Sequence, residues 1–562
     1  MSSQLSPPTE ECVSIPENAV HAVSVSLPLW KHNVAYEEGD PELSRKMKSG
    51  YPRFKIHYKI EELVETVEKN YGREGEKAMI FATYNAAGRC REFIRIRHPD
   101  ASVRVLRLCC PKTCENNYEV NIAVVFFPAD LFSVAKQYWQ HTGEGISSRQ
   151  AQYFQDRLDE ENNTVKAPEA PTPAQESLPS LATPPQEIFV EERFGRYLSS
   201  RLANEAKPAL KKRIAMEVKR RGHEKVTSDD IFLYQCGMAA IYSSYRAVME
   251  LKKTKETGLK AVCFGFPYTD TLKILQKWGP GCEFFPIGDE NDLNSLATRL
   301  DSGELKISAL FCEVPSNPLL KTPDTRRIRE LATKHDFLVV IDDTVGNIAN
   351  IDCLKPADIC VSSLTKVFSG DCNVMAGDMV LNPEGAHYEE LVKIVKDQHE
   401  ASLWAEDAIY LERNSRDFYD RNQRINSNAE TVVNVLLDYQ KNHPAKLIKD
   451  VNYPKCVPSK RYYDDIKFAD GGYGGLLSVV FNNPKAAIAF YDTLFIAKGP
   501  SLGTNFTLGC PYTIIAHYNE LEFVNSCGVD THLVRISIGL EEKDDLIQRF
   551  KVALDAAEHA AC

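Results

Sequence analysis

The chain has no uninterrupted apolar run near the about 18 residues that a helix needs to cross a bilayer. Residues 1–14 also lack the basic start and apolar core of a secretory signal, and the arginine-rich character of a transit peptide. We therefore expect a cytoplasmic protein without a membrane-spanning segment.

Basic residues are not in excess, because 67 Lys and Arg stand against 78 Asp and Glu, for a net charge of -11. A protein that binds a phosphate backbone needs a localised basic stripe. The densest basic segments, 211–213 and 219–221, lie in a helix-like stretch flanked by acidic residues, which is typical of a solvated helix face. Nucleic acid is therefore not expected as a partner.

The 16 cysteines do not fall into regularly spaced pairs. Several, such as Cys263 and Cys360, lie inside apolar runs, and Cys109, Cys110 and Cys114 have no second ligand pair at zinc-finger spacing. This pattern predicts reduced thiols in the core, with neither a disulfide framework nor a metal site.

The composition is that of a globular protein, with 43% hydrophobic and 26% charged residues. Residues 164–186 depart from it, because they are rich in proline and keep no apolar period, which predicts a linker. We expect an N-terminal unit of unknown role in residues 1–163, a large domain in 187–400 and a smaller domain in 401–562.

Apolar periods predict the class of each part. The N-terminal unit reads as α/β, with a helix at 60–71 and strands at 103–108 and 122–127. In the large domain β-rich runs alternate with helical segments, which predicts a mostly parallel sheet with helices on both faces. Its predicted strands are 261–264, 307–312, 337–341, 359–362 and 379–381, and its helices include 271–278 and 324–335. The last part reads as α+β, with helices at 422–440 and 544–559 and strands at 476–481 and 532–538.

Functional groups of such a sheet lie at the carboxyl ends of its strands. Lys366 follows one predicted strand end, in Ser362-Ser363-Leu364-Thr365-Lys366. A lysine there is partly desolvated, which lowers its pKa and supplies the free amine that imine formation requires. The hydroxyls of Ser363 and Thr365 could hold a phosphate beside it. The structural alternative is an exposed strand edge.

Three more residues have a functional and a structural interpretation. Asp342 ends the most apolar strand, where a carboxylate could keep the pyridine nitrogen of a cofactor protonated, or simply cap a turn. Gly237 opens a predicted helix, where backbone N–H groups could approach a phosphate, or is an ordinary loop glycine. Tyr268 offers a face for a flat ring, or packs in the core.

Each signal is weak alone, but all of them fall at the same predicted edge of one sheet. Along the chain they follow in the order Gly237, Tyr268, the run Glu313-Val314-Pro315-Ser316-Asn317-Pro318, Asp342 and Lys366. That order is specific.

In these residues the chain resembles the pyridoxal-phosphate (PLP) enzymes of cysteine and methionine metabolism, whose fold is the aspartate-aminotransferase-like type I. The resemblance covers residues 187–562 and is closest at SLTKVFSG (363–370), GPSLGT (499–504) and LVRISIGLE (533–541). Within the family it is similar to the fungal cystathionine γ-synthases, as is the N-terminal unit with Gly50-Tyr51-Pro52-Arg53-Phe54.

The resemblance implies PLP as the cofactor, held by Lys366 as a Schiff base and paired with Asp342 at its pyridine nitrogen. Lys366 would also move protons, and Tyr268 would take part in catalysis. The other implied contacts are to the phosphate (Gly237, Met238, Ser363, Thr365), the ring (Tyr268), its 3-oxygen (Asn317) and the substrate α-carboxylate (Arg535, Ser501). No metal is implied.

The implied reaction is a γ-replacement on a small amino acid. Cysteine would displace the acyl group of an O-acylhomoserine and give cystathionine, a transsulfuration step in methionine biosynthesis. Two alternatives stay open: a related enzyme that uses sulfide or a carbon nucleophile in a specialised pathway, and a non-catalytic binding protein with a PLP-type fold.

The family's sites are completed across a subunit interface, which implies a homodimer or homotetramer. Many members use a Tyr-x-Arg pair of the neighbouring subunit to bind the phosphate. The best match here is Phe194-Gly195-Arg196, with Arg196 as the phosphate ligand, and Tyr51-Pro52-Arg53 is a rival match.

Overall fold

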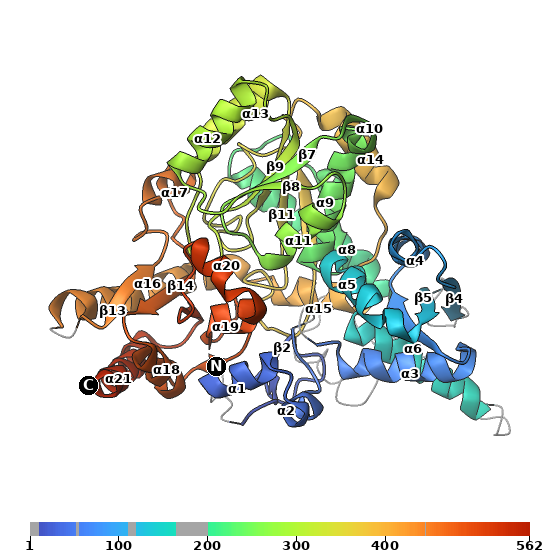
Figure 1. The fold of residues 1–562 in the computed structure, drawn as a ribbon, viewed down its shortest axis with the longest axis horizontal. Helices are drawn as coiled ribbons and strands as arrows, with labels where there is room; N and C mark the ends of the chain where they lie inside the picture. Colours follow the sequence, from blue (N-terminus) through green and yellow to red (C-terminus); the bar gives the residue numbers. More distant parts are fainter. Residues whose placement is uncertain (1–9, 52–54, 111–119, 165–199, 444–445) are drawn as a thin grey trace.

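The computed structural model describes residues 10–51, 55–110, 120–164, 200–443 and 446–562. Figure 1 shows a large sheet with its helices in green and yellow, a C-terminal domain in orange and red on one side, and a blue to cyan N-terminal unit on the other. In the described part of the chain no helix is long and apolar enough to cross a membrane.

The large domain is built on a seven-stranded sheet in the order β6-β12-β11-β10-β9-β7-β8. β12 runs antiparallel to both of its neighbours and the other pairs are parallel, so the predicted mostly parallel sheet is confirmed. The strands are β6 (Ile231–Tyr234), β7 (Lys260–Phe264), β8 (Cys282–Phe285), β9 (Ile307–Glu313), β10 (Leu338–Asp342), β11 (Ile359–Ser362) and β12 (Gly377–Leu381).

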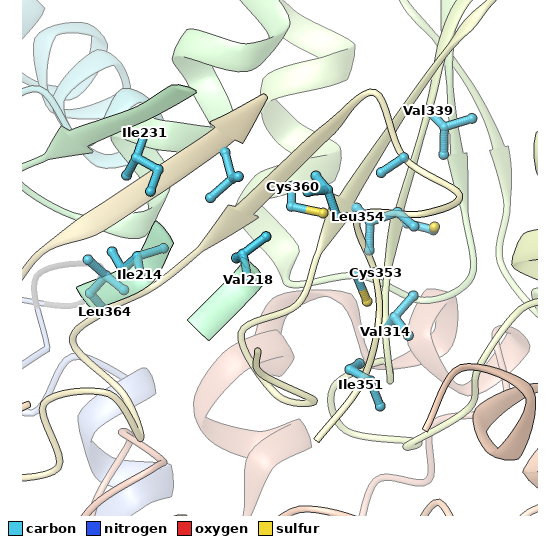
Figure 2. Packing of buried hydrophobic residues seen from close by; sticks show 14 of the residues in the cluster. Ile214, Val218, Ile231, Val314, Val339, Ile351, Cys353, Leu354, Cys360 and Leu364 are labelled. Atoms are coloured by element: carbon cyan, nitrogen blue, oxygen red, sulfur yellow. The ribbon is translucent and has the colours of Figure 1, made fainter. Parts of the chain in front are cut away.

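Helices cover both faces of this sheet because each strand buries side chains on both sides. One face carries α9 (Gly237–Leu251), α11 (Thr269–Lys277) and α14 (Tyr388–Gln398). The other carries α8 (Ser200–Arg220), α12 (Glu290–Asp301), α13 (Thr325–His335) and α15 (Ala405–Asn414). Figure 2 shows part of this second layer, where Ile214 and Val218 of α8 lie in one cluster with Ile231, Cys360 and Leu364. The short α10 (Thr254–Thr257) and η2 (Ser228–Asp230) lie in connections.

The C-terminal domain has a five-stranded sheet in the order β13-β14-β17-β16-β15. Its core joins that sheet to α16, α18 and α21. Its strands are β13 (Ile448–Asn452), β14 (Leu476–Phe481), β15 (Ala497–Lys498), β16 (Leu508–Cys510) and β17 (Val534–Ser537). Its helices are α16 (Phe418–Asn442), α17 (Lys460–Ile466), α18 (Pro484–Thr493), α19 (Tyr512–His517), η3 (Tyr518–Glu520), α20 (Leu521–Ser526) and α21 (Lys543–Ala561).

The N-terminal unit is a three-stranded antiparallel sheet in the order β3-β5-β4, covered on both faces. α3 and α6 pack on one face and α4 and α5 on the other. Its elements are α3 (Tyr58–Tyr71), β3 (Glu76–Phe81), α4 (Tyr84–Arg97), β4 (Arg104–Cys110), β5 (Val120–Pro128), η1 (Ala129–Leu131), α5 (Phe132–Thr142) and α6 (Ser148–Thr164).

Residues 10–51 pack largely elsewhere, against the C-terminal domain. They form β1 (Ser14–Ile15), β2 (Ser24–Val25), α1 (Trp30–Glu37) and α2 (Pro41–Lys46). The Trp30 ring stacks on His532 with 5.9 Å between ring centroids, and the Leu27 N–H donates to the carbonyl of Lys498 at 2.9 Å. In Figure 1, α1 lies beside α19, and α2 lies next to α1. We call residues 10–51 the N-terminal arm.

Several ion pairs fasten the N-terminal unit to the large domain. Arg149, in the first turn of α6, pairs with Asp407 of α15 at 3.0 Å, and their side chains are only 4% and 3% exposed. Arg89 of α4 pairs with Glu400 at 2.8 Å. The unit is therefore docked through buried charge and cannot shift without exposing it.

Replacing Arg149 with methionine removes one partner of that buried pair. We expect Arg149→Met to destabilise the protein by about 3 kcal/mol, because the buried Asp407 loses its ion-pair partner. The midpoint of urea unfolding, followed by intrinsic fluorescence, measures this loss.

The matched control is Lys225→Met, which breaks the exposed Lys225–Glu384 pair, with side chains 68% and 58% exposed. We expect it to cost about 0.5 kcal/mol or less. Equal losses in the two variants would contradict a special role of the buried pair.

Candidate active site

The carboxyl edge of the large sheet gathers the ionisable residues. Asp342 ends β10 and pairs in register with Glu313, the last residue of β9. Lys366 follows Ser362, the last residue of β11. Parallel neighbours end at the same edge of a sheet, so these groups meet although they lie far apart in the sequence.

A cavity of about 620 Å³ opens at this edge. Tyr51 and Glu313 line it together with most of the predicted site residues: Gly237, Met238, Tyr268, Asn317, Asp342, Ser363, Lys366 and Arg535. Thr365 lines an adjoining cavity, and the hydroxyl of Ser501 accepts a hydrogen bond from Lys366. The structure thus brings these predicted residues together, whereas Arg196 lies outside the described residues.

The amine of Lys366 is buried, with 6% of the residue exposed. Its Nζ donates to Ser501 Oγ at 3.2 Å and lies 4.2 Å from the centre of the Tyr51 ring. Burial lowers the pKa of this amine from 10.5 to about 7, and the positive charge of Arg535 acts in the same direction. A substantial fraction of Lys366 is therefore neutral at physiological pH.

Glu313 and Asp342 lie side by side at the ends of β9 and β10. Burial raises the pKa of Glu313 and of Asp342, and the nearby Asp342 raises the pKa of Glu313 further. Glu313 accepts the backbone N–H of Tyr268 and, at 3.0 Å, that of Asn317. Its carboxyl group therefore ties together the two loops that carry Tyr268 and Asn317.

Arg535 lies on β17, in the C-terminal domain, and reaches the cavity of the large domain. It donates to Asn317 Oδ1 at 3.1 Å and to the carbonyls of Pro500 and Ser501 at 3.0 and 2.9 Å. These partners orient the planar guanidinium, and none of the three carries a negative charge that would neutralise it, which suits the binding of a carboxylate.

The start of α9 forms another wall. A Cβ on Gly237 would lie 2.7 Å from the Cβ of Ser363, so only glycine lets this turn come so close to the loop after β11. The Ser363 N–H donates to Thr344 Oγ1 at 2.8 Å. The hydroxyl of Thr365 donates to the carbonyl of Ala376 at 3.2 Å and accepts its N–H at 3.1 Å, so in this structure it holds a loop.

These residues fit a flat, phosphate-bearing aldehyde cofactor such as PLP. The site offers a buried amine at Lys366, a carboxyl group at Asp342, an aromatic ring at Tyr268, and a tight helix start at Gly237 that a Cβ would fill. In the described residues no group of three or more His, Cys, Asp or Glu could hold a metal ion.

Glu313 and Tyr51 are site residues whose roles the sequence pattern does not predict. Glu313 was visible, because it opens the run that ends at Pro318, but its role depends on the register between β9 and β10. Tyr51 was noted only in a rival match, and its place follows from the course of the N-terminal arm.

Two family models match the chain. The model "Cys/Met metabolism PLP-dependent enzyme" matches residues 164–555, and "Fungal trans-sulfuration enzyme, N-terminal domain" matches residues 59–147. The second match spans the three-stranded sheet of the N-terminal unit with α3, α4 and α5, and it ends just before α6.

Curated relatives resemble the chain over nearly its whole length. A cystathionine gamma-synthase of Neurospora crassa is 43% identical, with 98% of this chain and 99% of the relative covered. A cystathionine gamma-synthase of Saccharomyces cerevisiae is 39% identical, with 97% and 98% covered. The crystal structure of cystathionine gamma-lyase from yeast aligns with a TM-score of 0.50 at 24% identity, covering 60% of this chain and 84% of that one, which bears on the fold alone.

The resemblance stated from the sequence is thereby confirmed for the fold, the cofactor and the family. The chain belongs to the family of Cys/Met metabolism PLP-dependent enzymes.

Proposed function

We propose that this protein joins cysteine to an O-acylhomoserine by γ-replacement, with release of the acyl group and formation of cystathionine. The observation that carries the proposal is the meeting of Lys366, Asp342 and Arg535 at one cavity. The near full-length similarity to two proteins named cystathionine gamma-synthase supports this choice among PLP reactions.

In this proposal Lys366 holds PLP covalently, and Asp342 faces the pyridine nitrogen and keeps it protonated. When bound, PLP supplies an electron sink for charge that develops at the substrate carbons. Tyr268 would pack against the ring, and Asn317 would contact its 3-oxygen. The phosphate is held at the start of α9 and the loop after β11, by Gly237, Met238, Ser363 and Thr365.

The second role of Lys366 is to move protons once the substrate amine has taken its place. A lysine amine accepts a proton only when it is neutral, and at an ordinary pKa of 10.5 that form is rare near neutral pH. Burial supports the role, because it brings the pKa to about 7. The Ser501 hydroxyl, which accepts a hydrogen bond from Nζ, orients the amine toward the cavity.

Arg535 binds the α-carboxylate of the amino-acid substrate in this proposal. Its contacts with the carbonyls of Pro500 and Ser501 and with Asn317 fix the guanidinium plane before the substrate arrives. A fixed fork loses little entropy when it binds a carboxylate with two parallel hydrogen bonds.

The proposal includes a cytoplasmic homodimer or homotetramer, with Arg196 of a neighbouring subunit at the phosphate. The 14 cysteines whose side chains the structure describes carry free thiols, which suits a reducing compartment. Cell fractionation and light scattering on the purified protein check the two statements separately.

The direct test begins with the cofactor. Purified protein incubated with PLP should show a visible absorbance band that borohydride abolishes, and peptide mapping should place a pyridoxyl group on Lys366. Lys498 is the internal control, since it is also buried with a pKa lowered to about 8 but binds the carbonyls of Pro28 and Asp492 away from this cavity. Its peptide should stay unmodified.

The reaction is then measured by mass spectrometry with cysteine and either O-acetyl- or O-succinylhomoserine, and cystathionine is the expected product. Formation of homocysteine in competition with added sulfide would shift the assignment to the related sulfide-using activity. Absence of an adduct at Lys366 would remove the catalytic proposal and favour the binding-protein alternative.

The lowered pKa of Lys366 also predicts how stability depends on pH. Between pH 7 and 10.5 the unfolded chain keeps a lysine proton that the folded, cofactor-free protein has lost. Stability therefore rises with pH across this window. Lys366→Met lacks this contribution, so we expect its advantage over the wild-type protein in the urea midpoint to be largest near pH 7 and to shrink as the pH rises.

The control for this comparison is Lys485→Met, at an exposed lysine at the start of α18. Its midpoint should follow the wild-type curve at every pH. If the urea midpoint of Lys366→Met also changes with pH in parallel with that of the wild-type protein, Lys366 does not carry a lowered pKa.

Replacing Arg535 with lysine tests the carboxylate contact. Arg535→Lys keeps the positive charge but cannot donate two parallel hydrogen bonds to a carboxylate. The loss of one hydrogen bond to a charged group lowers substrate affinity by about 10- to 100-fold. We expect KM for the amino-acid substrates to rise by this factor, with a smaller change in kcat, in steady-state assays. Arg213→Lys, at a second arginine that binds Glu412 and Ser415, should leave KM unchanged.

A further inference from the structure

The N-terminal unit contacts the turn at the start of α9 through the backbone of Gly143, which has no side chain. Gly143 ends α5 with φ of 64°, a conformation that favours glycine. Its carbonyl oxygen lies 3.4 Å from the thiol of Cys236, which donates to it. A Cβ on Gly143 would lie 2.5 Å from the Cys236 sulfur, 2.9 Å from the Met238 Cβ and 3.0 Å from the Ala239 nitrogen. There is no room for a side chain at this contact.

Residues of the large domain pack closely against the other sides of the same turn. A Cβ on Gly237 would meet Ser363 at 2.7 Å, and a Cβ on Gly377 of β12 would meet the Cys236 carbonyl at 2.4 Å. The turn thus lies between Gly143 of the N-terminal unit and the sheet edge. Because close-packed contacts transmit small displacements, the position of its backbone N–H groups depends on both sides.

The N-terminal unit cannot withdraw from this contact to relieve pressure. The Arg149–Asp407 pair anchors α6 immediately after Gly143, and Glu144 binds Arg89, which also reaches Glu400 at 2.8 Å. Both attachments are at least three-quarters buried on the N-terminal side. An added side chain at Gly143 would therefore push on the α9 turn.

The N-terminal unit also walls the space beside this turn. A second cavity of about 940 Å³ is lined by Trp139 and Gly143 of the unit and by Thr365 of the large domain. It shares residues with the first cavity, namely Tyr51, Gly237, Met238, Tyr268 and Ser363. The region proposed for the phosphate is thus closed on one side by the N-terminal unit.

We propose that the N-terminal unit is an integral wall of the cofactor-phosphate site, and that Gly143 is the positioning residue through which it acts. Gly143 sets the place of Gly237 and Met238, whose backbone N–H groups lie at the start of α9. This inference rests on the proposed binding of PLP. It goes beyond the proposed function because it gives the N-terminal unit a role.

The test compares PLP with pyridoxal, which has the same ring and aldehyde but no phosphate. Gly143→Ala in the full-length protein should weaken PLP binding by roughly 5- to 100-fold, the range expected from overpacking a tight contact. Pyridoxal binding should stay unchanged. Both are titrated by absorbance after the resident cofactor is removed with hydroxylamine.

Gly75→Ala is the matched control. Gly75 has φ of 78° and lies in the same unit, but a Cβ there would meet nothing within 4 Å. It carries the same backbone strain without the contact, so its ratio of PLP to pyridoxal affinity should equal that of the wild-type protein. The proposal would be overturned if the ratio of PLP to pyridoxal affinity in Gly143→Ala equalled that of the wild-type protein, or if this ratio fell equally in Gly143→Ala and Gly75→Ala.

Removing the nearest clashing atom should restore part of the PLP affinity. The double variant Gly143→Ala/Cys236→Ala lacks the sulfur, so we expect it to bind PLP more tightly than Gly143→Ala alone. If the losses of PLP affinity in the two single variants simply added up in the double variant, the proposed contact would be contradicted. If Gly143→Ala does not fold, Cys236→Ala alone decides. It loses the bond to the Gly143 carbonyl and should weaken PLP by about 2- to 10-fold with pyridoxal unchanged; no change overturns the proposal.

The two proposals fail in distinguishable ways. A wild-type protein that binds no PLP removes the proposed function, and this is seen before any variant is compared. A wild-type protein that binds PLP but forms no cystathionine leaves the role of Gly143 testable, because the binding ratio does not depend on the acceptor.

Discussion

Keeping the Lys366 amine out of water is the constraint on which the rest of the site depends, and no single domain achieves it. The strand end after β11 supplies the lysine, the C-terminal domain supplies Ser501 and Gly503, and the N-terminal arm places Tyr51 over Nζ. A Cβ on Gly503, where φ is 69°, would lie 2.8 Å from the Cβ of Lys366. The lowered pKa is thus a product of the whole assembly, since exposure on any side would restore an ordinary charged lysine.

One hydrogen-bonded chain connects these parts. Glu313 accepts the N–H of Asn317, whose side-chain oxygen accepts from Arg535, and Arg535 donates in turn to the carbonyl of Ser501. The hydroxyl of Ser501 accepts from Lys366. Arg535, which is proposed to bind the substrate carboxylate, and Lys366, which is proposed to move the substrate proton, therefore share Ser501 as a partner. A displacement of one of them reaches the other. Glu313 is the first member of this hydrogen-bonded series, and it acts on Arg535 only through Asn317.

Sequence reasoning was strongest where pattern decides structure. Apolar runs located β7, β9, β10, β11 and β12 but not β6 or β8, and the order of the located strands placed Asp342 and Lys366 at one edge, because parallel strands leave little freedom in where their ends lie. The antiparallel direction of β12 was not predictable, since a buried strand has the same apolar run in either direction. The contact of Gly143 with the α9 turn was also beyond the pattern: a glycine after a helix reads as an ordinary C-cap, and only packing shows what lies against it. Arg196 stays a prediction, because it lies outside the described residues.

The charges around the second cavity give that prediction a physical reason. The basic residues among its described lining are His21, Lys55, His57 and Arg149. Burial lowers the pKa of both histidines, Lys55 pairs with Glu61 at 3.0 Å, and Arg149 pairs with Asp407. Arg535 lines only the first cavity. The described residues thus offer a phosphate neutral donors, the N–H groups of the α9 turn and the hydroxyl of Ser363, whereas a phosphate dianion is bound most strongly by a charged fork. An arginine from a neighbouring subunit would supply that charge, and Arg196 is the residue that the sequence offers for it.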